Sequence, residues 1–263
     1  MNKQPIGFFD SGVGGLSIWQ EVTSLLPQED TIYLADSLNA PYGEKCTDEI
    51  IKLSVKNTDK LIELGCKIII VACNTATTNA ISYLRNKYPI PFIGIEPAIK
   101  PASVQTKSKN IGILATKGTL NSKLFEETSN KYLEGITIIE TIATGLVTLI
   151  ENDQIESEEM SILLDRYISP MLTKKIDCLV LGCSHYPFLI KKIRTKLGAK
   201  IKIIDSGLAV AKQTKNILDI KQIANNAVDY QGKHLIYSNT QIQTIKKLIK
   251  HSMRNTILIK EIF

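Results

Sequence analysis

Short apolar runs recur along the chain, and each has the length and composition of a buried β-strand. They are rich in Ile, Val, Leu and Phe and read PIGFFD, TIYLAD, KIIIVAC, PFIGIE, NIGILAT, ITIIETI, CLVLGC and KIKIID. Unbroken apolar runs of this length are typical of parallel strands that are covered on both faces. The pattern therefore predicts parallel sheets in the interior.

The segments between these runs have the periodicity of amphipathic helices. In residues 47–65 apolar residues fall at helical spacing, among them Ile50, Leu53, Val55, Leu61, Ile62 and Leu64, and Gly65 is a suitable helix stop. NSKLFEETSNKYL and PFLIKKIRTKLG have a similar pattern, and the second also ends on glycine. Apolar strands that alternate with such helices predict an α/β protein.

Each half of the chain contains one apolar strand that ends on a cysteine and is followed by small polar residues. These elements are VACNTATT around Cys73 and LGCSHYP around Cys183, and the thiols are 183 − 73 = 110 residues apart. Two prolines interrupt the alternation of strands and helices in EPAIKPASVQ, which suits a domain boundary. The chain can return to the first domain near residues 205–213. We therefore predict two domains, one of residues 1–97 with 208–263 and one of residues 98–207.

Composition narrows the class of protein. With 44% hydrophobic and 22% charged residues in 263, the chain predicts a soluble globular protein with a sizeable core. The N-terminus lacks the apolar stretch of a signal peptide, and no run is long enough to span a bilayer. Five cysteines, an odd number without a C-x-x-C pair, favour free thiols in a reducing cytoplasm over disulfides or a structural metal site.

The net charge of +6 does not by itself indicate a nucleic-acid partner. Lysines are spread along the chain, and only 6% of the residues are aromatic. A nucleic-acid binder more often concentrates basic residues on one element with aromatic residues between them. Solvated helix faces explain the charge better, so neither nucleic acid nor a membrane is expected as a partner.

Polar residues follow several of the predicted strands, at the edge of a parallel sheet where ligands bind. The glycines of DSGVGGLS miss the spacing of both dinucleotide and Walker loops, so nucleotide binding is not favoured. That segment can be a plain strand–turn–helix corner capped by Asp10 or Ser11. We favour a ligand crevice with Asp10 at its strand end, joined by Tyr42 and Gly43 of APYGEK.

The cysteines divide into two groups. Cys46, Cys66 and Cys178 are expected to be small buried hydrophobic residues. Cys73 and Cys183 lie at strand exits beside expected helix N-termini, and a histidine, His185, follows the second. A helix N-terminus and a nearby cation both lower a thiol pKa from about 8.5 toward neutrality. His234 and His251 have no such neighbours and are expected to be surface or structural residues.

Two activated thiols are compatible with three kinds of chemistry. A Cys–His hydrolase would leave one thiol unused, and a redox pair would favour the absent C-x-x-C motif. In the third, one thiolate removes a proton from a carbon atom and a thiol on the opposite face returns one. That reaction inverts a stereocentre and needs two bases across a cleft, which two similar halves would supply.

The motifs together resemble those of the glutamate racemases, in the cofactor-independent aspartate/glutamate racemase superfamily. The matching stretches run in family order from near residue 6 to near residue 190 and are IGFFDSGVGGLS, YLADSLNAPYGEK, VACNTATT, GIEPAIKPA, LATKGT and LGCSHYPFL. The resemblance implies two pseudo-symmetric α/β domains with glutamate in the cleft between them. It implies that Cys73 deprotonates D-glutamate and Cys183 deprotonates L-glutamate.

The resemblance also implies which residues contact the substrate. They are Asp10, Ser11, Tyr42, Gly43, Asn74, Thr75, Ser184 and His185, with Thr116, Thr119 and Glu151 as neighbours of the site. Asp10 and His185 would also tune the thiols. Two departures are Ser184, where the family most often has threonine, and Cys46, where serine is usual.

Further expectations follow from the same resemblance. They are an enzyme without cofactor or metal, a homodimer, and a role in supplying D-glutamate for bacterial peptidoglycan. The N-terminal extension that some relatives use for activation by a cell-wall precursor is not expected. An aspartate racemase is the nearest alternative, and a second role without catalysis stays open because some relatives contact DNA topoisomerase.

Overall fold

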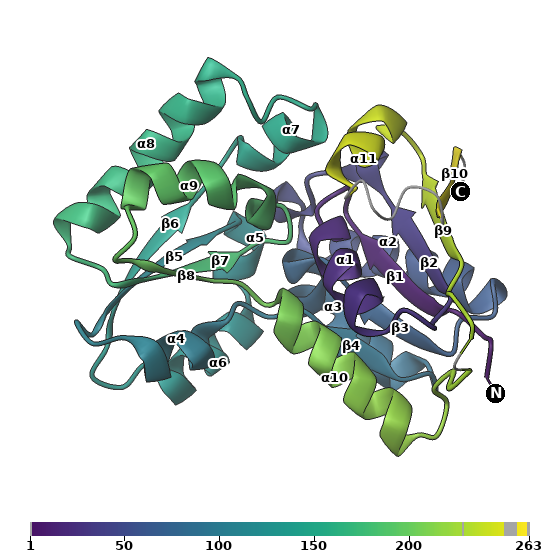
Figure 1. Cartoon of the computed structure of the whole chain (residues 1–263). Coiled ribbons are helices and arrows are strands. Elements are labelled where there is room, and N and C mark those ends of the chain that lie inside the picture. The colour runs from purple at the N-terminus through teal and green to yellow at the C-terminus, as the bar shows by residue number, and fades with distance from the viewer. Residues whose placement is uncertain (1, 228, 250–256, 262–263) are drawn as a thin grey trace.

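The structure is a computed structural model that describes residues 2–227, 229–249 and 257–261, and its helices pack around two separate sheets (Figure 1). One sheet has six strands in the order β10-β9-β2-β1-β3-β4, and the other has four in the order β6-β5-β7-β8. Every strand pairing in both sheets is parallel. The predicted α/β class with parallel sheets is therefore confirmed.

Of the ten strands in the described residues, β1 to β8 fall on the eight predicted runs, whereas β9 and β10 do not. Those of the six-stranded sheet are β1 (Ile6–Asp10), β2 (Thr31–Ala35), β3 (Ile68–Val71), β4 (Phe92–Gly94), β9 (His234–Ser238) and β10 (Ile257–Glu261). Those of the four-stranded sheet are β5 (Asn110–Ala115), β6 (Thr137–Ile142), β7 (Cys178–Gly182) and β8 (Lys202–Ile204).

Helices cover both faces of the six-stranded sheet. The α-helices on this side are α1 (Leu16–Leu25), α2 (Thr47–Glu63), α3 (Asn74–Lys87), α10 (Gly207–Ile220) and α11 (Ile242–Leu248). Phe8 and Ile70 belong to the apolar cluster under α1 and α10, whereas their neighbours Phe9 and Val71 belong to the cluster under α2 and α3. Successive side chains point to opposite faces of a strand, so a strand buried on both faces must be apolar throughout.

The four-stranded sheet is covered in the same way. Its helices are α4 (Ile99–Gln105), α5 (Lys117–Leu120), α6 (Lys123–Tyr132), α7 (Leu146–Glu151), α8 (Glu158–Thr173) and α9 (Ile190–Leu197). In Figure 1, α8 and α9 lie on one face of this sheet and α4 and α6 on the other. Three single turns of 3-10 helix complete the elements, namely η1 (Ser37–Asn39), η2 (Tyr42–Glu44) and η3 (Tyr186–Leu189).

The two sheets repeat one strand order. The run β2-β1-β3-β4 in the first sheet corresponds to β6-β5-β7-β8 in the second. In this correspondence β3 matches β7, and these are the strands that lead to Cys73 and Cys183. The two thiols therefore occupy equivalent places in two similar sheets. The domain boundaries at residues 97/98 and 207/208 remain a prediction.

The predicted helix over residues 47–65 is confirmed by α2, which is followed by Gly65 in the left-handed region with φ +77°. The sequence reading missed β10, whose side chains are alternately half-buried and exposed along most of its length. Such a short edge strand lacks the apolar run that marks the central strands. His251 lies outside the described residues.

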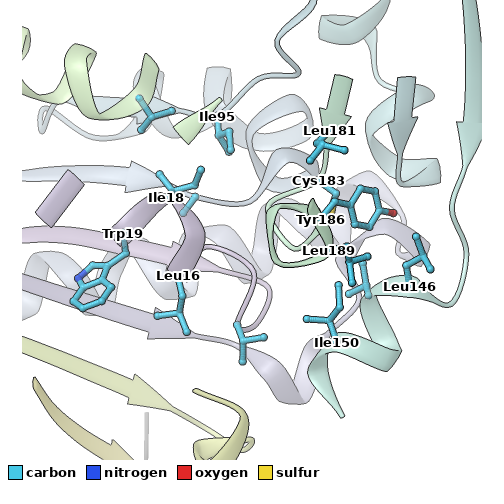
Figure 2. Packing of buried hydrophobic residues seen from close by; sticks show 14 of the residues in the cluster. Leu16, Ile18, Trp19, Ile95, Leu146, Ile150, Leu181, Cys183, Tyr186 and Leu189 are labelled. Atoms are coloured by element: carbon cyan, nitrogen blue, oxygen red, sulfur yellow. The ribbon is translucent and has the colours of Figure 1, made fainter. Parts of the chain in front are cut away.

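One apolar cluster extends through both halves. Figure 2 shows Leu16 and Trp19 of α1 in the same cluster as Tyr186 and Leu189 of η3. Trp19 is the single tryptophan of the chain, and its indole N–H donates to Thr31 Oγ1 at 2.9 Å. The core is therefore shared between the sheets, while two further clusters belong to one sheet each.

A buried ion pair lies at the opposite end of the first sheet from the two cysteines. Lys67 Nζ is 2.5 Å from Glu29 Oε2, and both side chains are at most 4% exposed. The other oxygen of Glu29 accepts a hydrogen bond from the Asn225 backbone N–H at 2.7 Å. None of the helices within the described ranges is both long and apolar enough to cross a membrane.

Candidate active site

A small cavity lies where the carboxyl ends of strands from both sheets meet. Its lining residues are Ser11, Pro41, Tyr42, Gly43, Cys73, Asn74, Thr75, Thr116, Val147, Cys183, Ser184 and His185. Both cysteines are therefore on the wall of one cavity, one from each half of the chain. Among the lining residues, all within the described ranges, there is no lysine or arginine.

Cys73 occupies the N-cap position of α3. The Ala76 backbone N–H donates to its sulfur at 3.4 Å, and its thiol donates to Ser11 Oγ at 3.8 Å. Burial and the nearby carboxylate of Asp10 raise the pKa of the Cys73 thiol above its ordinary value. The Ala76 N–H at the helix N-terminus lowers this pKa as predicted, but the net shift is upward, so the predicted shift toward neutrality was wrong. One backbone N–H cannot offset the loss of water around the sulfur.

Cys183 has a different neighbourhood. Its sulfur is 3.7 Å from Nδ1 of His185, and Nε2 of that ring is 2.6 Å from Glu151 Oε1. The histidine and glutamate side chains are both buried. Burial alone would lower the pKa of His185, but its hydrogen bonds to Cys183 and Glu151 raise it well above the ordinary value. His185 is therefore suited to remain an imidazolium at neutral pH beside the sulfur.

Glu151 connects α7 of the second half to two segments of the first half. The Val13 backbone N–H donates to Oε1 at 2.7 Å, and the Ser37 hydroxyl donates to Oε2 at 2.8 Å. With His185 on Oε1 as well, both carboxylate oxygens have partners. These bonds fix the orientation of the imidazole relative to Cys183.

The glycines of the DSGVGG segment make room for these side chains. A Cβ atom on Gly12 would lie 1.9 Å from Glu151 Oε1, and one on Gly14 would lie 2.1 Å from His185 Nδ1. The segment is thus more than a turn, because its glycines allow the His185–Glu151 pair to approach the backbone.

Gly14→Ala should therefore lower activity strongly, because the new methyl group displaces His185 from Cys183. We expect a loss of at least about 10²-fold, the contribution of one acid or base group. The rate of the expected racemisation, followed by circular dichroism, measures it. Gly135→Ala is the control for activity: a Cβ there meets no atom within 4 Å, and the strain from its φ of +69° stays in a turn outside the cavity lining. Full activity in Gly14→Ala would show that the close approach does not matter.

Asp10, at the end of β1 in the first half, binds Ser184 of the second half beside the cavity. Its Oδ1 accepts a hydrogen bond from the Ser184 hydroxyl at 3.1 Å, and its Oδ2 accepts one from the Gly12 N–H at 3.0 Å. Burial raises the pKa of the Asp10 carboxyl, against the opposing effect of His185. The hydroxyl of Ser184 thus performs the hydrogen bonding that threonine would perform at this position.

Tyr42 is held by a polar network behind the cavity. Its hydroxyl donates to Asp36 Oδ2 at 2.6 Å and accepts from Asn57 Nδ2 at 3.2 Å. The next residue, Gly43, lies so close to Thr116 that a Cβ would come within 2.7 Å of it. The η2 turn is therefore fitted tightly against the second half.

Three threonine hydroxyls meet across the two halves. Thr75 Oγ1 is 2.9 Å from Thr116 Oγ1 and 3.4 Å from Thr119 Oγ1. Asn74 donates weakly to the Ile95 carbonyl at 3.5 Å, and its own side-chain oxygen is buried without a partner in the structure. Asn74 and Thr75 also begin α3, so their backbone N–H groups lie at a helix N-terminus, where an anion is favoured.

The substrate-contacting residues expected from the sequence, other than Asp10, all line this cavity together with both cysteines. Asp10 does not line it but accepts a hydrogen bond from Ser184, which does. Sequence reasoning missed the supporting residues Ser37 and Asp36, although both lie in the YLADSLNAPYGEK motif. Polar residues directly before Tyr42 were the available signal. Their roles as catalytic or binding groups remain a proposal.

The other cysteines and histidines follow the expectation with one exception. Cys66 and Cys178 are buried, and burial raises the pKa of Cys66 to about 12. Cys46 is exposed at the start of α2, so its prediction as a buried residue was wrong. His234 is a structural residue, packed edge-on against Trp19. Within the described part of the chain, no three His, Cys, Asp or Glu side chains are grouped as in a metal site.

Comparisons with known proteins agree with this architecture. Residues 16–214 match the model of the Asp/Glu/Hydantoin racemase family. A glutamate racemase of Herpetosiphon aurantiacus is 44% identical over 225 residues, which cover 86% of this chain and 89% of that one.

Solved structures of two other glutamate racemases have the same fold. The Bacillus anthracis enzyme superposes with a TM-score of 0.88 at 28% identity, covering 100% of this chain and 98% of that one. The Escherichia coli enzyme, solved with L-glutamate and the activator UDP-MurNAc-ala, superposes with a TM-score of 0.84 at 31% identity, covering 98% of this chain and 97% of that one.

Two parallel sheets with a thiol at equivalent strand ends, together with these relatives, define the protein as an isomerase of the racemase class. The chain belongs to the Asp/Glu/Hydantoin racemase family, in which its relatives described above are glutamate racemases.

Proposed function

We propose that this racemase interconverts L- and D-glutamate by moving the α-proton between Cys73 and Cys183. The observation that carries the proposal is the placement of both thiols on one cavity wall, from equivalent strands of two similar sheets. A thiolate on one side removes the α-proton, and a thiol on the other side delivers a proton to the opposite face of the carbon.

The two sulfurs have different surroundings in the free enzyme. The hydrogen bonds of His185 raise its pKa and so favour an imidazolium, which lies 3.7 Å from the sulfur of Cys183. Burial and Asp10 favour the protonated form of Cys73, whose pKa they raise. One thiolate and one thiol are what each turnover requires, and the raised pKa of Cys73 favours this residue as the thiol.

The lining of the cavity suits a small dicarboxylate held by neutral donors. Ser11, Asn74, Thr75 and Ser184 offer hydroxyl and amide groups, and the N-terminus of α3 offers backbone N–H groups. A lysine or arginine in the same place would stabilise both sulfurs as thiolates. The Escherichia coli relative was solved with L-glutamate bound, which supports the same substrate here. A closed and dry site also strengthens these electrostatic interactions.

The rate of racemisation should follow a bell-shaped dependence on pH. The alkaline limb is expected above about 8.5, the ordinary thiol value, because burial and Asp10 raise the pKa of the Cys73 proton that the reaction needs. Initial rates by circular dichroism over the neutral and alkaline range measure it. A limb at or below the ordinary thiol value would contradict the proposed protonation state.

Exchange of the α-proton with solvent tests the function directly. The protein is incubated with pure L- or D-glutamate in D₂O, and both optical rotation and deuterium at Cα are followed. We expect loss of rotation together with deuterium in the inverted product. Inversion of aspartate but not glutamate would identify an aspartate racemase instead.

The geometry also favours one alternative. Cys183, His185 and Glu151 are arranged like the Cys–His–acid triad of thiol hydrolases. The sulfur is 3.7 Å from His185 Nδ1, and His185 Nε2 is 2.6 Å from Glu151 Oε1. Such an enzyme would need only one of the two thiols and would not exchange the α-proton. Release of product from a thioester substrate without deuterium at Cα would establish this alternative.

The proposal includes the biological setting. D-Glutamate made in the cytoplasm would supply bacterial peptidoglycan synthesis, and the enzyme would act as a homodimer. Light scattering of the purified protein reports the oligomeric state. Growth of a strain that depends on added D-glutamate, after expression of this chain, reports the supply of D-glutamate.

A further inference from the structure

Asn79 lies on α3 behind the cavity wall and joins the two halves of the molecule. Its amide Nδ2 donates to the Thr75 carbonyl at 2.9 Å and to the Gly118 carbonyl at 3.0 Å. Its Oδ1 accepts from the Thr47 hydroxyl at 3.2 Å. One side chain therefore connects the start of α2, α3 and α5, and α5 belongs to the second half.

The elements that Asn79 joins carry residues of the cavity wall. Thr75 of α3 and Thr116, the N-cap of α5, both line the cavity, and their hydroxyl oxygens are 2.9 Å apart. A Cβ atom on Gly118 would lie 2.8 Å from Thr75 Cγ2 and 3.2 Å from Gly43 Cα. The two helices thus touch without spare space, and a small shift of α5 would separate the two hydroxyls.

The cavity is closed over both sulfurs. Cys73 is 4% exposed and Cys183 is 6% exposed, so a substrate or a thiol reagent can reach them only after some edge of the site opens. The halves are joined on another side by the shared apolar cluster, which water cannot replace. The contact of α3 with α5 is polar, and water can take over its hydrogen bonds at a modest net cost. This edge is therefore easier to open than the side held by the apolar cluster.

We propose that Asn79 is a positioning residue that holds α5 against α3, so that the Thr75–Thr116 pair is aligned and the cavity stays closed over Cys73 and Cys183. The part of this proposal that concerns the Thr75–Thr116 pair rests on the proposed racemisation of glutamate. The closure of the cavity does not depend on that function, so it is tested separately.

The test of closure is the rate at which iodoacetamide labels each cysteine, followed by mass spectrometry. The background variant is Cys46→Ser, because the exposed Cys46 would consume reagent and serine is a good N-cap. Adding Asn79→Ala should speed the labelling of Cys73 and Cys183 about tenfold, the effect of losing the one hydrogen bond that joins α3 to α5 at Gly118. Cys66 and Cys178, buried elsewhere, should be labelled at unchanged rates.

Two further variants sharpen the result. Asn130→Ala makes the same change on α6, where Asn130 is exposed and outside the cavity lining, and should leave all rates unchanged. Gly118→Ala should reproduce the effect of Asn79→Ala, because its methyl group pushes α5 away from Thr75. Alanine is also a better helix former than asparagine, so weakening of α3 does not explain faster labelling.

The kinetic part is measured with glutamate. Asn79→Ala should raise KM about tenfold and change kcat less, since substrate binding depends on the aligned pair. Equal acceleration at all four buried cysteines, or at none, would overturn the proposed closure. An unchanged KM would overturn the alignment. Selective labelling in a protein that does not racemise glutamate would retain the closure and refute the proposed function.

Discussion

Cys73→Ala and Cys183→Ala are each expected to lower the rate of glutamate racemisation by about 10²- to 10⁴-fold, the contribution of one acid or base group. Each change removes the only sulfur on its side of the cavity wall. Circular dichroism of pure L- and D-glutamate gives the rates, and the far-ultraviolet spectrum checks the fold. Cys46→Ala, at an exposed position, is the matched control and should retain full activity.

The same variants separate the two proposed chemistries. If both sulfurs act as bases, each variant loses racemisation, while the remaining sulfur can still exchange the α-proton of one enantiomer with deuterium. If Cys183 alone is a nucleophile, Cys73→Ala keeps its activity and no variant exchanges the α-proton. The second outcome would refute the mechanism with two bases.

Lys67→Met is expected to lower the free energy of unfolding by about 3–5 kcal/mol, the cost of leaving one partner of a buried ion pair alone. The Glu29 carboxylate would keep its bond to the Asn225 N–H but lose its cation, while burial would persist. Urea unfolding followed by the fluorescence of Trp19 measures the change. Activity at temperatures below the transition should be unaffected, since neither residue lines the cavity.

Two comparison variants identify the cause. Lys67→Met combined with Glu29→Gln should regain much of the stability, because no unpaired charge remains buried. Lys60→Met removes one partner of the more exposed pair with Glu63 and should cost less than about 1 kcal/mol. A similar loss in Lys60→Met and Lys67→Met would show that burial does not decide the effect.

The fold was largely predictable because its central strands are buried on both faces. Strands such as β3 and β7 must then be apolar at every position, which makes them visible in the sequence. The cysteines were visible for the same reason, since each breaks the pattern where such a strand ends. The edge strand β10 has no such constraint and was missed.

The supporting groups of the site could not be predicted in the same way. Glu151 meets His185 across 34 residues of sequence and Val13 across 138, and no periodicity connects such positions. Gly14 illustrates a second limit, because its importance comes from a side chain that packs against it from the other half. The raised pKa of Cys73 is a third case, since burial in the fold outweighs the local helix N-terminus.

The apolar cluster that runs from Trp19 to Tyr186 has a consequence for protein engineering (Figure 2). Because the two sheets share this core, a segment cut at the predicted boundaries would expose the apolar side chains that meet the other half. Neither half is then an independent module. A chimera that takes one half from a relative would also need, from the same relative, the residues of the other half that pack in the shared apolar cluster. Recombination within this family is therefore restricted.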